Sequence, residues 1–208
     1  MDTRPLGDTT ERIRQRLEAK HLVREEGLAL AREVIRLAAV AIRAVHRRDF
    51  SLAEAYLAQA RAKLEQASHA LAPHPDIYYA GFLQDAQKEY AEASCTLALI
   101  EGRPLPTPEE LGLEDGPYLN GLGEAVGELR RYLLDCLREG DLNKGEEALT
   151  AMSDIYDALT TIDYPEAITG GLRRTTDNVR AILERTRGDF TLAYVQRRLE
   201  QKLQGQRP

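Results

Sequence analysis

Apolar residues recur along this chain with the spacing of an amphipathic helix. The segment from residue 78 to residue 93 shows this clearly, because one helical face there would carry the apolar residues Tyr79, Phe82, Leu83, Ala86, Tyr90 and Ala93. Ala, Leu, Arg and Glu dominate the composition, whereas Val and Ile are sparse, which favours helix over sheet. No segment has a convincing strand pattern. The chain is therefore predicted to be all-α.

Glycine, proline and capping residues divide this pattern into about seven helices. The breaks fall at residues 49–50, 73–75, 103–117, 140–141, 161–165 and 188–189. The expected helices accordingly cover residues 8–48, 51–72, 75–102, 117–139, 141–160, 165–187 and 191–203. They are expected to pack as one helical bundle domain, 1–208, in which residues 1–8 and 204–208 are frayed.

The first expected helix is long for a domain of this size. Roughly forty helical residues would extend over about 60 Å, which exceeds the diameter of a typical domain. This helix is therefore expected either to project from the bundle or to pack against another subunit.

Two segments place several carboxylates on one helix face. Asp85, Glu89 and Glu92 are four and then three residues apart, and Glu124 and Glu128 are four apart. Like charges at this spacing repel one another, and a hard divalent cation such as Mg²⁺, which prefers carboxylate oxygen, would relieve the repulsion. A solvated face of an acidic protein is the alternative interpretation.

The helix expected after Pro117 is rich in glycine. Gly121, Gly123 and Gly127 each weaken a helix by about 1 kcal/mol relative to alanine. Small residues at these positions would allow another backbone or a ligand to come close. A close contact is therefore expected on this side of the helix.

Composition and charge restrict the function only weakly. The net charge of −6 argues weakly against nucleic acid as a partner, but the arginines are clustered, and a local basic patch is what binds phosphates. Cys95 and Cys136 lie in helical patterns without metal-ligand spacing, so two buried thiols in a cytoplasmic protein are expected. The chain has neither an apolar signal segment at its start nor the roughly 18–20 uninterrupted apolar residues of a membrane span. No membrane association is expected.

Four segments, in order, resemble the translin superfamily, and in particular its branch of proteins similar to translin-associated factor X. They are IRAVHR at 42–47, KEYAEA at 88–93, YLNGLGEAVGELRR at 118–131 and DYPEAITGGLRR at 163–174, followed by Asp177, Arg180, Glu184 and Arg187. Each motif is individually weak, whereas four of them in order are fairly specific. Together they extend from about residue 30 to about residue 190, with helix breaks in the expected places.

The resemblance implies a seven-helix protomer of the translin type that assembles into a hollow homo-octamer. It also implies binding of single-stranded RNA inside the shell, with single-stranded DNA as an alternative ligand. A hetero-oligomer with a translin-like subunit is the alternative to the homo-octamer. In the translin-associated branch it implies endoribonuclease activity that depends on Mg²⁺ or Mn²⁺. A catalytically silent assembly that binds single-stranded RNA or DNA is the alternative function.

Carried over by position, the resemblance assigns the metal ligands to Glu89, Glu92 and Glu124. The family usually has Asp where this chain has Glu124, so the carboxylate is one methylene group farther from the backbone. Glu128 is a fourth candidate for the catalytic site, either as a further acid or as a group that orients the ligands. Carboxylate-bound Mg²⁺ would activate a water molecule and neutralise the charge of the phosphodiester transition state.

The candidates for contact with nucleic acid are the cationic or titratable side chains Arg43, His46, Arg47, Arg48, Arg173 and Arg174. The first four are expected at the end of the first helix, where they would contact phosphates or stabilise the helix dipole. Arg173 and Arg174 could instead pair with Asp163 or Asp177. Tyr79 could stack on an unpaired base, but its helical spacing favours a place in the core.

Overall fold

The computed structural model describes residues 5–204, and every regular element within that range is a helix. Six long helices carry the fold: α1 (Leu6–His46), α2 (Phe50–Leu71), α4 (Phe82–Glu101), α6 (Asp115–Glu139), α7 (Leu142–Thr160) and α9 (Leu172–Gln204). Three single turns lie in the connections: α3 (Pro75–Tyr78), α5 (Pro108–Leu111) and α8 (Glu166–Thr169). The all-α prediction is confirmed.

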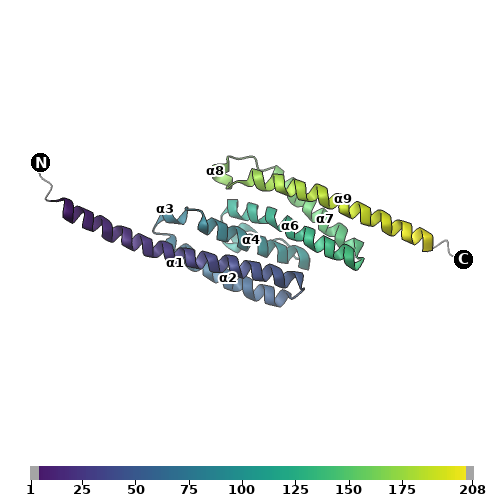
Figure 1. The fold of residues 1–208 in the computed structure, drawn as a ribbon, viewed down its shortest axis with the longest axis horizontal. Helices are drawn as coiled ribbons and strands as arrows, with labels where there is room; N and C mark the ends of the chain where they lie inside the picture. Colours follow the sequence, from purple (N-terminus) through teal and green to yellow (C-terminus); the bar gives the residue numbers. More distant parts are fainter. Residues whose placement is uncertain (1–4, 205–208) are drawn as a thin grey trace.

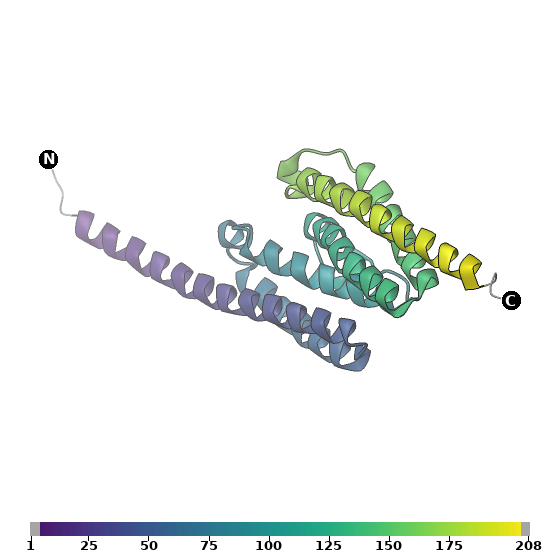
Figure 2. The same ribbon diagram turned by 45° about the vertical axis from the view of Figure 1, so that its right-hand side comes forward.

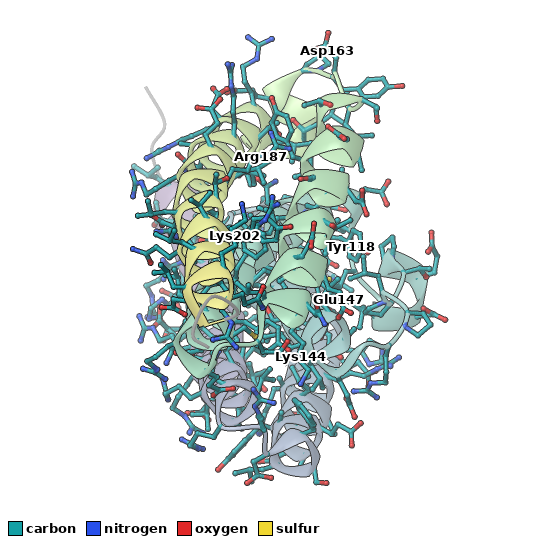
Figure 3. All side chains as sticks on the ribbon, turned by 90° about the vertical axis from the view of Figure 1, so that its right-hand side faces the viewer. Tyr118, Lys144, Glu147, Asp163, Arg187 and Lys202 are labelled. Atoms are coloured by element: carbon teal, nitrogen blue, oxygen red, sulfur yellow. The ribbon has the colours of Figure 1, made fainter. Side chains whose placement is uncertain are left out.

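The long helices form two groups of three that meet at the contact between α4 and α6. Helices α1 and α2 are an antiparallel pair that packs on α4, whereas α7 and α9 both pack on α6 and on each other (Figure 1). In the end-on view of Figure 3, α7 and α9 lie side by side on one side of the molecule, and α1 and α2 lie on the opposite side. The contact between α4 and α6 therefore holds the two groups together.

Each group has its own hydrophobic core. The first is built from α1, α2 and α4 around fully buried residues such as Val34, Leu71 and Leu83. The second is built around α6, α7 and α9 and includes Leu133 and Met152, which are also fully buried. Because both cores border the contact between α4 and α6, side chains at that contact are held from two sides.

Three predictions of helix continuity are wrong. The helix expected over residues 165–187 is divided by Gly170 and Gly171, whose φ values of 61° and 88° separate α8 from α9. The helix expected over residues 75–102 is divided into α3 and α4. Gly81 lies between them, directly before α4, with a φ of 102° that a helix does not allow. Conversely, the break expected at Gly188 and Asp189 is absent, because α9 continues through both residues. Phe190 is buried in the second core, and Asp189 accepts a hydrogen bond from the Arg130 guanidinium at 2.7 Å. These contacts with the rest of the bundle favour the helix where local sequence favours a break.

The ends of the first two helices also differ from expectation. Helix α1 begins at Leu6, two residues before the expected start, so part of the segment expected to fray is helical; residues 1–4 and 205–208 lie outside the described chain. Helix α1 ends at His46. Helix α2 is capped by Asp49, whose carboxylate accepts from the backbone N–H of Leu52 at 3.2 Å, so α2 begins at Phe50, one residue before the expected start.

Both the N-terminal part of α1 and the C-terminal part of α9 extend beyond the bundle, at opposite ends (Figures 1 and 2). Both carry exposed apolar residues: Leu6, Ile13, Leu17 and Leu22 on α1, and Leu192, Val195, Leu199 and Leu203 on α9. The expected projection of the first helix is therefore present. Along residues 5–204, none of the helices combines the length and the hydrophobicity that a membrane crossing requires.

Candidate metal centre

Helices α4 and α6 come unusually close at Gly121. A Cβ atom at this position would overlap the carbonyl oxygen of Lys88 and would lie 2.6 Å from the Cβ of Ala91. Only glycine can therefore occupy the contact without moving one of the helices. The close approach expected from the glycine-rich sequence is present, and it brings the following turn of α6, with Glu124, against the acidic face of α4.

Three of the predicted acids meet at this contact. Glu89 and Glu92 of α4 and Glu124 of α6 each offer a carboxylate oxygen, and these oxygens lie within 4.8 Å of one another. All three side chains are half-buried. Asp85, one turn earlier on α4, is exposed and is not part of the group. Helical spacing alone placed Glu89 and Glu92 together, but only the packing of α6 on α4 brings Glu124 to them.

Lys88 pairs with two of these carboxylates. Its ammonium group donates to both carboxylate oxygens of Glu124, each at 2.7 Å, and lies 3.3 Å from Glu89. Burial opposes the charged ammonium, but the hydrogen bonds and charges of Glu124 and Glu89 outweigh it and raise the pKa of Lys88. Lys88 was not among the residues predicted for the site. Its signal in the sequence was weak: Lys88 lies four residues before Glu92, a spacing that solvated helix pairs also have, and its main partner Glu124 is on another helix.

Glu92 is the most strongly perturbed acid of the group. Burial, together with the negative charges of Glu89, Glu124 and Glu128, raises its pKa from 4.5 to about 8, against the opposing charge of Lys88. The carboxylate is therefore largely protonated at neutral pH in the metal-free protein. A cation bound between these acids would favour its ionised form.

Glu128 lies beside the group but has a different partner. Its carboxylate lies 2.5 Å from Nε2 of His46, a ring that is only 5% exposed, and this hydrogen bond lowers the pKa of Glu128 despite its burial. His46 was predicted as a contact for nucleic acid. Its side chain is instead buried against α6, where a ligand on the surface cannot reach it. It instead holds Glu128 in place next to the cluster.

The carboxylates border two hollows of the surface. A pocket of about 280 Å³ is lined by Glu92, Glu124 and Glu128 together with α9 residues such as Asn178. A larger groove of about 950 Å³ extends from Lys88 and Glu124 along the start of α4 and α6, and Arg174 lies in its wall. A ligand in the groove would therefore lie directly beside the acidic cluster.

Asn120 joins the site to the helices that follow it. Its side-chain amide donates to the carbonyl oxygens of Gly116 and Thr169, both at 2.8 Å, and accepts from the Thr175 hydroxyl at 2.6 Å. These bonds connect α6 with α8 and α9 one turn before Glu124. Asn120 was not among the predicted site residues, since a buried asparagine inside a helix has no local signature.

The predicted arginines occupy two separate surfaces. Arg43, Arg47 and Arg48 are exposed at the end of α1, where Arg48 pairs with Glu139 at 3.0 Å. Arg173 and Arg174 are exposed at the start of α9, and Arg173 lies 3.9 Å from Asp163. Of the five, Arg174 lines the groove beside the acidic cluster.

Tyr79 is exposed, contrary to its expected place in the core. Its side chain is 68% exposed and lines the same groove as Arg174, with its ring held edge-to-face against Tyr78 at a centroid distance of 4.8 Å. The interruption at Gly81 removes Tyr79 from the helix on which its apolar spacing was based. An exposed aromatic ring in a groove is a suitable surface for stacking of an unpaired base.

No family model matches this chain. An uncharacterized protein of Methanocaldococcus jannaschii is 33% identical to it over 181 residues, which are 84% of this chain and 78% of that protein. Two solved structures are similar in both sequence and fold. The structure of AfC3PO in complex with duplex RNA is 35% identical with a TM-score of 0.84, and the crystal structure of AfC3PO is 36% identical with a TM-score of 0.81. Each match covers 91% of this chain and 98% of that chain.

The apo-NeC3PO structure is a more distant match. It is 22% identical, covers 90% of this chain and 96% of that chain, and has a TM-score of 0.74. At this identity the match indicates a common fold.

Proposed function

Since the chain belongs to the translin superfamily, in its group of C3PO proteins, we propose that it is an RNA-binding endoribonuclease that depends on Mg²⁺ or Mn²⁺. One observation carries the proposal: three carboxylates from two helices meet within 4.8 Å of one another beside an open groove. Glu89, Glu92 and Glu124 are the proposed metal ligands, and Glu128, held by His46, is the proposed fourth acid of the site.

The donor set suits a hard divalent cation. Carboxylate oxygens are the ligands that Mg²⁺ and Mn²⁺ prefer. Burial is the main cause of the raised pKa of Glu92, and the negative charges of Glu89, Glu124 and Glu128, which such an ion would offset, raise it further. When bound, the ion would supply an activated water molecule and counter-charge for phosphodiester hydrolysis. The protein contributes fixed oxygens on two helices: Gly121 allows α6 to lie against α4, and Asn120 ties α6 to α8 and α9 one turn before Glu124.

We propose single-stranded or flexible RNA as the substrate, with single-stranded DNA as an alternative ligand. A structure of AfC3PO in complex with duplex RNA is known, so a duplex belongs among the substrates to be compared. In this chain the groove beside the cluster offers Arg174 for phosphate contact and the exposed Tyr79 ring for stacking. Arg173 and the exposed arginines at the end of α1 (Arg43, Arg47 and Arg48) are proposed as additional phosphate contacts.

We also propose that the chain acts as a hollow cytoplasmic homo-oligomer, an octamer, or as one subunit of an assembly with a translin-like chain. The exposed apolar residues on the projecting parts of α1 and α9 support an assembly, because apolar surface of this extent is typical of subunit interfaces. Cys95 and Cys136 are buried and unpaired, as is usual in a reducing compartment.

Cleavage of an end-labelled RNA tests the activity. Single-stranded and duplex RNAs of the same sequence would be incubated with Mg²⁺, with Mn²⁺ or with EDTA, using the wild type and the double variant Glu89→Gln, Glu92→Gln. Because even groups that only orient metal ligands contribute roughly 10–100-fold, we expect the double variant to lose at least 100-fold in cleavage rate. The variant Glu146→Gln, Glu147→Gln, which neutralises two exposed acids of α7, should cleave like the wild type.

Cleavage that continues in EDTA, or that survives in the double variant, would contradict a metal-dependent activity at this site. Absence of cleavage with retained, salt-dependent RNA binding would instead favour the second candidate, a catalytically silent RNA-binding assembly. The pairing of Glu124 with Lys88 favours this second candidate, because it gives the cluster a cation of its own.

A further inference from the structure

We propose that Lys88 is an internal counter-ion of the carboxylate cluster, which a divalent cation must displace, and that the displaced ammonium group then becomes available to RNA in the adjoining groove. The inference rests on the proposed metal site. It assigns a function to a residue that is neither one of the proposed ligands nor one of the proposed RNA contacts.

The geometry makes the lysine and a metal ion competitors. Lys88 already donates to both carboxylate oxygens of Glu124 at 2.7 Å and lies 3.3 Å from Glu89, so it engages two of the three proposed ligands. A divalent ion needs the same oxygens at roughly 2.0–2.6 Å. Two cations cannot occupy the same few oxygens at these distances without strong repulsion. Metal binding therefore requires the ammonium group to leave Glu124.

The pairing differs from the ion pairs on the surface of the molecule. Lys88, Glu89 and Glu124 are 25%, 29% and 38% exposed, whereas the partners of a typical surface pair, Arg14 and Glu11, are 69% and 49% exposed. Partial burial reduces the screening of charge by water, so an unpartnered cluster would be strongly self-repelling. Lys88 also links α4 to α6, which makes it part of the metal-free structure.

Lys88 lines the groove, so its displaced ammonium group could contact an RNA strand bound there. Lys88 and Arg174 are cations in its wall, where they face the four acids Asp85, Glu114, Asp115 and Glu124. With Lys88 held by Glu124, this wall presents an excess of negative charge to an RNA strand. With a divalent ion on Glu124, the excess falls and the ammonium group is free to contact a phosphate. Metal binding and RNA binding should consequently strengthen each other.

The first test is a calorimetric titration of the metal-free protein with Mn²⁺. The variant Lys88→Gln, which removes the charge, should bind Mn²⁺ tighter by on the order of tenfold, since the ion no longer has to break a charge-assisted pair. Lys88→Arg, which keeps a cation, should not gain affinity. Lys144→Gln is the matched control, because Lys144 pairs with Asp141 at 3.4 Å outside the cluster. Equal Mn²⁺ affinity of the wild type and Lys88→Gln would overturn the inference.

The second test follows the binding of a 2′-O-methyl oligoribonucleotide, which resists cleavage, as salt is varied. In the wild type, Mn²⁺ should add about one phosphate contact, so the slope of log K against log salt should become steeper by about 0.7. Lys88→Gln should not show this added slope. If Mn²⁺ steepens the slope equally in both proteins, the released lysine does not bind RNA and the inference is wrong.

The outcomes separate this inference from the proposed function. If neither the wild type nor Lys88→Gln binds Mn²⁺, the metal site itself is refuted, and the inference with it. If both bind equally well, the metal site stands and only the role of Lys88 falls. Should Lys88→Gln unfold without metal, refolding on addition of Mn²⁺ would support the inference, and failure to refold would overturn it.

Discussion

At the scale of single residues, the pKa of Glu92 depends on its burial and on the charges of the cluster around it. Burial raises its pKa most, the negative charges of Glu89, Glu124 and Glu128 raise it further, and the value reaches about 8. The folded protein therefore holds a proton at Glu92 that the unfolded chain, with an ordinary pKa of 4.5, releases. This difference connects stability to pH.

The sign of that connection gives a prediction for the metal-free protein. Between about pH 4.5 and about pH 8 the folded state binds more protons at Glu92 than the unfolded state, so this contribution to stability is complete below pH 4.5 and is lost as the pH rises through 8. The loss should amount to a few kcal/mol at most, on the order of one per pH unit. Urea unfolding in EDTA, from pH 5 to pH 8.5, measures it.

The variant Glu92→Gln should remove this part of the pH dependence, because glutamine is uncharged throughout. Glu128 does not interfere, since its lowered pKa places its own effect below pH 4.5. Glu147→Gln, an exposed acid on α7, serves as the control. Parallel stability curves for the wild type and Glu92→Gln would show that Glu92 is ionised in the folded protein at neutral pH.

At the scale of the helices, the contact between α4 and α6 decides whether the site exists. Gly121 allows the backbone of α6 to lie against Lys88 and Ala91 of α4, which brings Glu124 to Glu89. Glycine weakens a helix, so its presence here indicates that close contact outweighs helix propensity.

Two alanine substitutions on the same helix should have opposite effects. Gly121→Ala would force α6 away from α4 and should destabilise the protein by about 1–3 kcal/mol, as overpacked cores do. Gly127→Ala has no described atom within 4 Å of the added methyl group and should stabilise the helix by roughly 0.5–1 kcal/mol. Thermal and urea unfolding give the two values. Equal effects would mean that Gly121 does not set the helix separation.

Gly121→Ala should also weaken Mn²⁺ binding, whereas Gly127→Ala should leave it unchanged. This difference follows because only the first substitution separates Glu124 from Glu89 and Glu92. The same titration that tests Lys88 therefore also tests whether helix packing builds the metal site.

At the scale of the whole molecule, the projecting parts of α1 and α9 expose apolar side chains that no other described helix of the protomer covers. Val195 and Leu199 are each more than half exposed on a helix end that extends past the bundle. Figure 2 shows both projecting ends clear of the other helices. Such residues are more typical of a buried subunit contact than of a free surface.

Charged substitutions on α9 test the proposed assembly. Val195→Glu together with Leu199→Glu should shift the mass found by light scattering from an oligomer towards smaller species, because the interface would have to bury two charges. Gln196→Glu together with Gln201→Glu, which alters exposed polar positions of the same helix end, should leave the mass unchanged. A wild type that is already monomeric at micromolar concentration would refute the oligomer proposal.

Local signals in the sequence predicted most of the fold. The 3.6-residue periodicity identified the long helices, and Gly102 and Gly140 end α4 and α6 in the left-handed conformation that glycine favours. The spacing of Glu89 and Glu92 on one helix face was likewise readable, because it depends only on helix geometry. Where tertiary contacts opposed a local signal, as at Gly188, the local prediction was wrong.

The sequence by itself thus determined the long helices, the glycine-rich contact and the common face of Glu89 and Glu92, whereas Glu124 was assigned to the same site only by the family resemblance. Only the tertiary structure decided which side chains meet across helices: Lys88 with Glu124, 36 residues apart, and His46 with Glu128, 82 residues apart. The reason is physical. Periodicity and capping arise between residues within one or two helical turns, whereas these pairs depend on how closely α4 and α6 pack and on which faces they turn to each other.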